Sequence, residues 1–301
     1  MKVSIIVLNW NGYKDTIECL ESLQKVKVSD CELDVIVVDN ASTDDSVKQL
    51  RKLKNDFQLI ESDKNLGFAG GNNLGMKQAI ANGAEYIFIL NNDTEVHKDI
   101  IVELLKVMRS ERKIGLATPK IYFAKGYEFH KDRYKKNELG KIIWSAGGDI
   151  DWSNVYGVNH GVDYVDNGQF DNVAETDFAT GAATMINVAA LKSVGSFNED
   201  YFLYLEDLEL SERMRRKGWK IMYVPKAVVW HKVSQSSAVG GGLNDYYTTR
   251  NRLKFGMKYA SFRTKLALFR ESLRMLFNGR KWQKVGVMDY YVHNLGKGSW
   301  K

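Results

Sequence analysis

The fold is decided by the stretch Glu85-Tyr-Ile-Phe-Ile-Leu90, which runs directly into Asn91-Asn-Asp-Thr-Glu95. The first six residues are rich in β-branched and aromatic side chains and contain no Gly or Pro, which predicts a buried strand. The polar cluster follows at once, so Asp93 lies at the carboxyl end of a strand. Ligands of open α/β sheets bind at this edge, although an Asn/Asp turn that merely ends a strand has the same pattern.

Strand and helix patterns alternate through the first ninety residues. Buried-strand patterns cover 3–8, 34–38 and 57–61, and helical patterns cover 13–23 and a segment that ends near 53. Such alternation predicts an α/β fold with a Rossmann-like, mostly parallel central sheet flanked by helices. Asp39, which ends the second strand, should then share the ligand-binding edge with Asp93.

Four glycines fall within nine residues of the segment Asn65-Leu-Gly-Phe-Ala-Gly-Gly-Asn-Asn-Leu-Gly75. We expect a flexible loop that leads into a helix at Met76, whose first N–H groups can face an anion or a base edge. The segment matches neither a Walker loop nor the dinucleotide fingerprint. A surface loop that needs positive φ angles would explain the glycines equally well.

Together, the two strand-end carboxylates and the glycine segment predict a nucleotide-sugar site. Asp39 is placed to accept hydrogen bonds from a base or a ribose hydroxyl. Asp93 could hold a divalent cation that bridges a diphosphate, because hard oxygen ligands suit Mg²⁺ or Mn²⁺.

Composition is that of an ordinary globular protein. The chain has 301 residues, of which 44% are hydrophobic and 27% charged, enough for one domain with or without an appendage. The two cysteines, Cys19 and Cys31, predict no disulfide framework. The first apolar run is too short for a signal peptide or a membrane span, so we expect a cytoplasmic protein.

Several blocks of the sequence resemble the family 2 glycosyltransferases in order and spacing. The first four are Ser4-Ile-Ile-Val-Leu-Asn-Trp-Asn-Gly12, Val37-Val-Asp-Asn-Ala-Ser-Thr-Asp44, the glycine segment 65–75 and Leu90-Asn-Asn-Asp-Thr94. Three later blocks, at 180–186, 194–200 and 202–210, are similar to the rhamnosyltransferase-like branch. The resemblance covers about residues 3 to 255. It implies a GT-A fold and an inverting hexosyl transfer from a nucleoside diphosphate sugar in cell-surface polysaccharide synthesis.

This resemblance also implies roles for individual residues. The nucleotide-binding residues would be Asn9, Asn11, Asp39, Asn65, Gly67, Asn72 and Asn92. The metal would be held by Asp93 with Asn91, and the acceptor would be bound by Thr180, Gly181 and Ala182. The family's metal motif is often Asp-x-Asp, so Asn91 is a departure: either metal affinity is weaker or another residue completes the shell, and Asn-x-Asp is common in this branch. The implied donor is dTDP-L-rhamnose, with a UDP-hexose as the alternative.

The catalytic block also makes chemical sense by itself. Inverting transfer needs a base that takes the proton of an acceptor hydroxyl as it attacks the anomeric carbon. Glu206 and Asp207 lie where the aromatic run 201–205 ends and a helix through Lys217 begins. The resemblance implies Asp207 as the base and Glu206 as the group that orients it or the acceptor. Without the resemblance, the simpler interpretation is that these two first-turn acids only complement the helix dipole.

Downstream residues add further candidates. His231 ends a predicted strand and could be a third metal ligand, although such a histidine is more often a surface residue. The Ser- and Gly-rich segment 234–242 suggests closure over the donor. Arg250, in the block 246–252, could contact the diphosphate with two hydrogen bonds. Trp144 and Trp152 could stack on acceptor sugars, or at least one of them could belong to the core.

Charge divides the chain unequally. Residues 246–301 contain thirteen Lys/Arg against two acids, a local +11, whereas residues 1–245 carry −5. We therefore expect a glycosyltransferase domain over 1–245, with a nucleotide half to about 118 and an acceptor and catalytic half from 119, and a basic helical extension over 246–301. The extension has an apolar stripe at Phe262, Leu266, Phe269, Leu273 and Leu276/Phe277, among Arg263, Lys265, Arg270 and Arg274.

Two places for this stripe remain open: the anionic inner face of the cytoplasmic membrane, beside a saccharide or lipid-linked oligosaccharide acceptor, or the surface of the catalytic domain. Nucleic acid is not an expected partner, since no nucleic-acid motif accompanies the basic residues. Two other classes compete with the transferase. A nucleotidyltransferase should carry Lys or Arg in a glycine loop near the N-terminus, and residues 8–12 have none. A non-enzymatic saccharide-binding protein would not need Asp39, Asp93 and Asp207 together.

Overall fold

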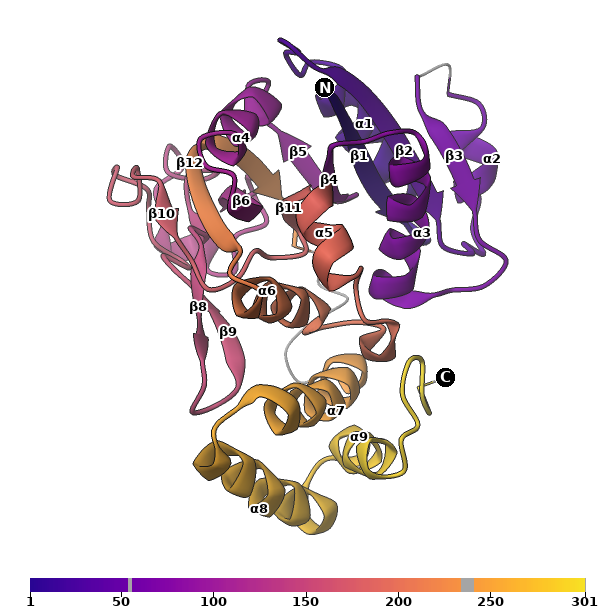
Figure 1. Cartoon of the computed structure of the whole chain (residues 1–301), viewed down its shortest axis with the longest axis vertical. Helices are drawn as coiled ribbons and strands as arrows, with labels where there is room; N and C mark the ends of the chain where they lie inside the picture. The colour runs from indigo at the N-terminus through magenta and orange to yellow at the C-terminus, as the bar shows by residue number, and fades with distance from the viewer. Residues whose placement is uncertain (54–55, 234–240, 301) are drawn as a thin grey trace.

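The computed structural model describes residues 1–53, 56–233 and 241–300, and in this part of the chain a ten-stranded sheet forms the centre (Figure 1). Its order is β10-β12-β6-β11-β4-β1-β2-β3, with β5 paired to β12 and β7 to β6. The strands are β1 (Lys2–Asn9), β2 (Glu32–Asp39), β3 (Gln58–Glu61), β4 (Tyr86–Asn91), β5 (Thr94–Val96), β6 (Ile114–Phe123), β7 (Ile143–Ser145), β10 (Ala174–Glu175), β11 (Ala183–Asn187) and β12 (Lys220–His231), with a separate hairpin of β8 (Gly148–Asp151) and β9 (Tyr156–Asn159).

Helices fill most of the connections. They are α1 (Tyr13–Leu23), α2 (Ser46–Leu50), α3 (Gly67–Ala81), α4 (Ile100–Met108), α5 (Val188–Val194), α6 (Glu206–Arg216), α7 (Gly242–Tyr259), α8 (Phe262–Asn278) and α9 (Lys281–Tyr291), with short 3₁₀ turns η1 (Lys131–Arg133) and η2 (Glu199–Tyr201). The predicted mostly parallel sheet flanked by helices is confirmed. β12 runs as one strand through Pro225, with a register shift between Val224 and Val228.

The strands β3, β2, β1 and β4 are parallel, and β11 lies antiparallel between β4 and β6. Asn9 pairs in register with Asp39, and Leu8 pairs with Asn91. The carboxyl ends of three parallel strands therefore meet at one edge, as the sequence predicts. This edge carries the first half of the candidate site.

The glycine segment is a helix and not the loop that we expected. Gly67 to Gly75 form the first half of α3, and Gly67 alone of the four has a positive φ angle, +72°. A Cβ on Gly71 would come within 2.5 Å of Leu8, and one on Gly75 within 2.6 Å of Ile6. The glycines therefore let α3 approach the sheet closely.

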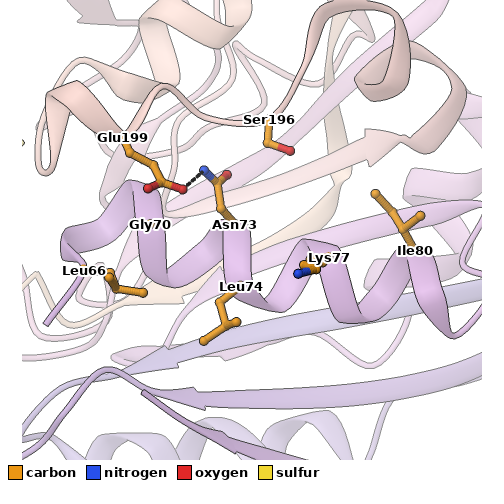
Figure 2. A pocket seen from close by; sticks show the side chains of 8 residues that line it. All are labelled: Leu66, Gly70, Asn73, Leu74, Lys77, Ile80, Ser196 and Glu199. Carbon is orange, nitrogen blue, oxygen red and sulfur yellow. Dashed lines mark hydrogen bonds between the residues drawn. The ribbon is translucent and has the colours of Figure 1, made fainter. Parts of the chain in front are cut away.

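The outer face of α3 forms an open groove of about 540 Å³ with the segment before η2 (Figure 2). Asn73 donates to Glu199 Oε1 and to the Phe197 carbonyl, 2.9 Å in each case. The groove is lined by none of the predicted site residues. Its polar contacts fasten α3 to the segment that leads into the catalytic block.

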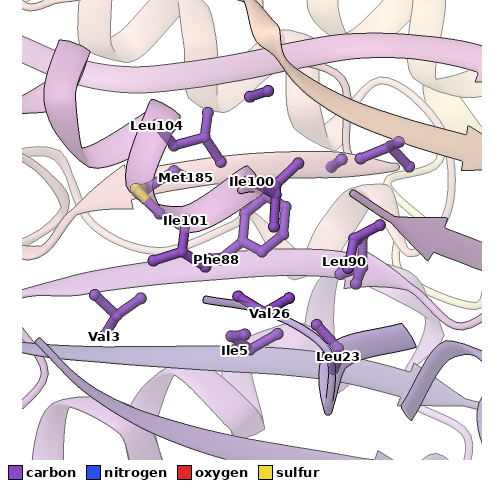
Figure 3. Packing of buried hydrophobic residues seen from close by; sticks show 14 of the residues in the cluster. Val3, Ile5, Leu23, Val26, Phe88, Leu90, Ile100, Ile101, Leu104 and Met185 are labelled. Atoms are coloured by element: carbon purple, nitrogen blue, oxygen red, sulfur yellow. The ribbon is translucent and has the colours of Figure 1, made fainter. Parts of the chain in front are cut away.

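The sheet is covered on both faces. One cluster packs strand residues such as Ile5, Phe88 and Leu90 against α1 and α4, as Figure 3 shows for Leu23, Ile100 and their neighbours. A second cluster packs the opposite face against α3, α5 and α6. Apolar side chains on both faces of a strand account for the unbroken hydrophobic runs in the sequence.

The C-terminal helices α7, α8 and α9 form a layer at the lower end of the molecule, below α6 (Figure 1). A third cluster contains Leu205 and Leu208 of the catalytic block together with Leu253 and Phe255 of α7. The domain boundary expected at 245/246 falls inside α7, most of whose residues are buried, and the boundary at 118/119 falls inside β6. α7 is thus packed into the fold, and the expected C-terminal helical region is present.

Two further expectations concern cysteines and membranes. Cys19 and Cys31 are both free thiols, as predicted. Among the described residues, no helix combines the length and apolar character needed to cross a membrane.

We predict that Gly75→Ala destabilises the protein. In an exposed helix this change stabilises by about 1 kcal/mol, but here the added methyl group meets Ile6 at 2.6 Å, and such overpacking costs about 1–3 kcal/mol. Denaturant unfolding should show a net loss for Gly75→Ala, with Lys77→Ala, an exposed change on the same helix, as the control. A gain in stability for Gly75→Ala would show that α3 is not packed as closely as described.

Candidate active site

Asp39 is held at the end of β2 by a buried hydrogen-bond network. Asn9 Nδ2 donates to Asp39 Oδ2 at 2.7 Å, and the backbone N–H of Ser42 donates to Oδ1 at 2.9 Å. Thr16 Oγ1 in turn donates to Asn9 Oδ1 at 2.8 Å. Asn9 is fully buried, so its side chain positions Asp39. The Asp39 side chain is itself almost fully buried, and its carboxylate retains acceptor capacity beyond these two bonds.

Three other predicted nucleotide residues connect the strand-end loops. Asn11 Oδ1 accepts from the N–H groups of Thr43 and Asp44. Asn92 Nδ2 donates to Thr16 Oγ1 at 3.0 Å, and Asn65 Oδ1 accepts from Asn40 Nδ2 at 3.1 Å. These contacts bring the blocks together at one edge.

The start of α3 is not a free anion site. The N–H of Gly67 is bonded to Asn65, and the N–H of Ala69 donates to the Phe202 carbonyl at 3.2 Å. A Cβ on Gly67 would lie 2.4 Å from the same carbonyl oxygen. Asn72 is fully buried and donates to the Phe68 carbonyl within the helix. Gly67 and Asn72 therefore serve packing in this structure, in place of the nucleotide contacts expected for them.

Two of the predicted metal ligands meet at the ends of β4 and β12. His231 Nε2 lies 3.0 Å from Asp93 Oδ1, and both side chains are largely buried. Within the described residues, His231 Nδ1 has no hydrogen-bond partner. The indole of Trp144 stands edge-on to the imidazole, with ring centroids 5.0 Å apart. Trp144 is thus placed beside the metal candidates.

This pair fits a divalent cation. Two ligands at right angles on an octahedral ion with bonds of about 2.1 Å lie roughly 3.0 Å apart, and imidazole nitrogen and carboxylate oxygen are suitable donors. The described residues contain no cluster of three or more His, Cys, Asp or Glu that could hold a metal. Donor phosphate oxygens, water and the Asn91 side chain would have to complete the shell, which is the usual arrangement for Mg²⁺ at a phosphate.

The catalytic candidates lie in the first turn of α6. Asp207 Oδ2 accepts from the N–H of Gly181 at 2.9 Å, and Oδ1 accepts from the N–H of Leu208 at 2.8 Å. Burial raises the pKa of Asp207 above the usual aspartate value, against the lowering effect of these two bonds. Burial, and then the charge of Asp207, raise the pKa of Glu206 well above its usual value. Both first-turn acids of α6 are therefore harder to ionise than free carboxyl groups.

One backbone segment joins the metal and catalytic candidates. The N–H of Gly181 holds Asp207, while the carbonyl of the next residue, Ala182, accepts from the N–H of Asn91 at 2.9 Å. Ala182 is buried, and a Cβ on Gly181 would touch the Phe68 ring. These two predicted acceptor residues therefore contribute backbone to the site, a role that the sequence did not reveal.

A cavity of about 230 Å³ opens beside Asp207. Its lining combines one carboxylate with aromatic rings and small polar groups, contributed by Tyr156, Gly157, Asn159, Phe178, Thr180, Tyr204, Leu205, Asp207, Leu208 and Thr248. Thr180 is the predicted acceptor residue that lies here. Tyr156 and Tyr204 were missed, because residues 120–175 have no clear period and Tyr204 stands in an irregular turn.

Arg250 lies away from the nucleotide edge. It is fully buried on α7, and its guanidinium donates to the carbonyls of Asp200, Tyr201 and Gly296. A diphosphate contact would require these bonds to break, so the role expected from the sequence is not supported. Trp152 stacks on Phe255 in the third core cluster, in agreement with the core alternative. The segment expected to close over the donor lies mostly outside the described residues.

Comparisons with known proteins agree with this arrangement. The glycosyl transferase family 2 profile matches residues 4–163, more than half of the chain, and the profile of glycosyl transferase family group 2 matches residues 86–296. The chain belongs to glycosyl transferase family 2. Two relatives are the low-salt glycan biosynthesis hexosyltransferase Agl10 of Haloferax volcanii, 26% identical over 73% of this chain and 63% of the relative, and the poly-beta-1,6-N-acetyl-D-glucosamine synthase of Staphylococcus aureus, 24% identical over 88% and 61%. The family 2 chain thus spans less than two thirds of the length of either.

Solved structures share the fold. GalNAc-T7 with UDP, GalNAc and Mn²⁺ aligns with a TM-score of 0.61 at 16% identity, over 97% of this chain and 57% of that one. Mannosyltransferase PcManGT of Pyrobaculum calidifontis with GDP-Man and Mn²⁺ aligns with a TM-score of 0.54 at 14% identity, over 99% and 87%. TarS 1-349 of S. aureus with UDP-GlcNAc gives 0.57 at 16%, over 96% and 79%. The expected GT-A fold of this family 2 glycosyltransferase is confirmed.

The two acids of α6 should respond differently to neutralisation. We expect Asp207→Asn to lower kcat by roughly 10²- to 10⁴-fold, the scale of losing a positioned base, with donor affinity within about threefold. Glu206→Gln should keep kcat within about tenfold, because the amide keeps the size and shape of a side chain that is not assigned as the base. Steady-state kinetics and donor titration measure both, and the opposite order would assign the base role to Glu206.

The pH profile should carry the same signature. Because the base must be ionised, activity is lost as the pH falls through the raised pKa of Asp207. We expect the acid limb of kcat above the value of about 3.9 for a free aspartate. A limb at or below that value would mean that the base is not desolvated.

Proposed function

We propose that the protein transfers a hexose, with inversion at the anomeric carbon, from a nucleoside diphosphate donor to a saccharide acceptor in polysaccharide synthesis, and that a divalent cation assists. The observation that carries this proposal is the segment 181–182, whose backbone bonds both the base candidate Asp207 and the metal block at Asn91. Donor phosphate and acceptor hydroxyl would thus be held in one rigid frame, which is what a single displacement needs.

Asp207 is the proposed base. Its carboxylate faces the 230 Å³ cavity and would take the proton of an acceptor hydroxyl while that oxygen bonds to the anomeric carbon. The bond to the donor phosphate breaks on the opposite side, so the configuration inverts. Desolvation makes the carboxylate a stronger base, and the Gly181 N–H keeps it oriented. Tyr156 and Tyr204 would contact the acceptor sugar.

Asp93 and His231, with Asn91, would hold Mg²⁺ or Mn²⁺. When bound, the cation neutralises the charge that develops on the departing diphosphate. Asp39, fixed by Asn9, would accept from the nucleoside, and the loop residues Asn11, Asn65 and Asn92 would shape its pocket. The fact that GalNAc-T7 and PcManGT are solved with Mn²⁺ supports a cation in this fold.

The donor has two supported candidates. The branch resemblance supports dTDP-L-rhamnose, whereas the names of the relatives and the ligands of the solved structures support a UDP- or GDP-linked hexose or N-acetylhexosamine. We put forward dTDP-L-rhamnose and treat a UDP-hexose as its direct competitor. The acceptor would be a growing saccharide, free or linked to lipid.

A donor screen tests the proposal. Hydrolysis or transfer from dTDP-, UDP- and GDP-sugars is measured with Mg²⁺, with Mn²⁺ and with chelator. We expect one donor to turn over with metal, and Asp93→Ala to lose the metal-dependent part of nucleotide affinity, since it removes the acidic ligand beside His231. The control is Asp99→Ala, which removes a partly exposed aspartate at the N-cap of α4. Unchanged affinity in Asp93→Ala with and without metal would remove the metal role.

We also propose that α8 docks on an anionic membrane surface, the inner face of the cytoplasmic membrane. Most of the predicted apolar stripe is exposed in the described part of the protein: Phe262 and Phe277 are 80% and 77% exposed and Leu266, Phe269 and Leu273 about 40%, whereas Leu276 packs against the third core cluster. The buried residues of α8 are Leu268 and Ser272, on the face that packs on the rest of the protein. The exposure of these five side chains favours the membrane alternative over a stripe buried on the catalytic domain.

Charge favours a lipid surface as the occupant of this face. Arg263, Arg270 and Arg274 are exposed beside the stripe, and each basic residue near an anionic leaflet contributes about 1 kcal/mol. Exposed Leu and Phe side chains would enter the interface. Docking of this kind would hold the cavity beside a lipid-linked acceptor.

Vesicle flotation tests the membrane proposal. The triple change of Arg263, Arg270 and Arg274 to Glu should weaken binding to phosphatidylserine-containing vesicles by roughly 100-fold or more. Reversal of Lys25, Lys131 and Lys136, which are exposed elsewhere, gives the same net charge and should weaken it far less. Binding should also fall with salt. Equal behaviour of the two variants, or no flotation of the wild type, would contradict docking through α8.

A further inference from the structure

The turn before the catalytic acids has an unusual backbone. Residues Phe202, Tyr204 and Leu205 have φ angles of 61°, 69° and 65°, in the left-handed region that side chains with a Cβ disfavour. Leu205 is the N-cap residue of α6 and has no side-chain cap. The 202–205 turn therefore needs support from outside, because nothing in its own sequence favours this conformation.

That support comes from two neighbouring residues of α7. Asn251 Nδ2 lies 2.8 Å from the carbonyls of Tyr201 and Leu203 and 2.9 Å from that of Tyr204. Arg250 Nη2 donates to the Tyr201 carbonyl at 3.0 Å and to that of Asp200 at 3.1 Å. Both side chains are fully buried. The polar groups of this turn thus find their donors on a helix that follows it by some fifty residues in the chain.

The same two residues are linked to each other and to the end of the chain. Arg250 Nε donates to Asn251 Oδ1 at 3.0 Å, which leaves the Asn251 amide nitrogen facing the turn. Arg250 Nη1 donates to the Gly296 carbonyl at 2.7 Å, and the guanidinium stacks over Tyr246 and Tyr247. If these carbonyls moved, the buried guanidinium would lose its hydrogen-bond acceptors. It therefore opposes any change in their positions.

We propose that Arg250 and Asn251 are positioning residues for sugar transfer: they hold the 202–205 turn so that the first turn of α6 presents Asp207 to the acceptor cavity. The proposal rests on the proposed function, since it concerns the same base. On the other side of the turn, the Phe202 carbonyl accepts from Ala69 of α3. Hydrogen bonds from α3 and α7 thus hold the turn on both sides, and Asp207 lies two residues after Leu205.

The test compares Asn251→Ala with Asp245→Asn. Asp245 also lies on α7 and is buried, but it pairs with Arg280 of α9 and bonds no residue of the turn. We expect both substitutions to weaken the packing of the C-terminal helices. Asn251→Ala should lower kcat by roughly 30-fold or more with the KM for the donor within about threefold, and Asp245→Asn should keep kcat within about threefold. Equal losses in the two variants, or a loss in Asn251→Ala confined to KM, would overturn the proposal.

A second measurement does not depend on activity. Hydrogen exchange of the peptide 200–208 should be as slow in the wild type as that of α6, and in Asn251→Ala it should speed up while peptides of β1 and β4 do not change. Fast exchange of 200–208 in the wild type would overturn the positioning role. If the exchange result holds and no donor turns over, the proposed function fails and the structural role of Arg250 and Asn251 stands.

Discussion

The hydrogen bond from the Gly181 N–H to Asp207 is the contact on which the candidate site depends. It crosses from the edge of the sheet to the first turn of α6, and the neighbouring carbonyl of Ala182 bonds Asn91 at the end of β4. Because β11 runs antiparallel to β4, its first residues lie at the carboxyl end of the parallel strands. The backbone groups at the start of the antiparallel strand β11 therefore lie at the same edge of the sheet as Asp39 and Asp93.

Much of this could be predicted from the sequence. The buried-strand patterns located β1, β2 and β4 to within two residues, because apolar runs of that length leave few alternatives. The resemblance also named Asp93 and His231 as candidate metal ligands; their side chains lie 3.0 Å apart, and the metal role stays a prediction. The glycine segment was predicted as a loop, but it is a helix. The sequence shows that these positions lack side chains, but it does not show that Ile6 and Leu8 fill the space beside them.

The C-terminal region was predicted less well from the sequence. Net charge suggested an appendage, yet α7 places Arg250 inside the molecule, where carbonyls of a distant turn meet its guanidinium. No periodicity in the sequence reveals a partner some fifty residues away. The amphipathic pattern of α8 was read correctly, but only the structure shows that its apolar face is left exposed. A helix that is packed on one side and apolar on another could link the catalytic layer to a surface outside the protein.

The central claim is that Asp207 acts as the base of a single displacement. The most direct measurement is the anomeric configuration of the first-formed product, determined by NMR with the donor that the protein accepts. The account predicts a configuration opposite to that of the donor. A product that retains the donor's configuration would contradict it, because retention requires a second displacement or a different path, and Asp207 as a base supplies neither.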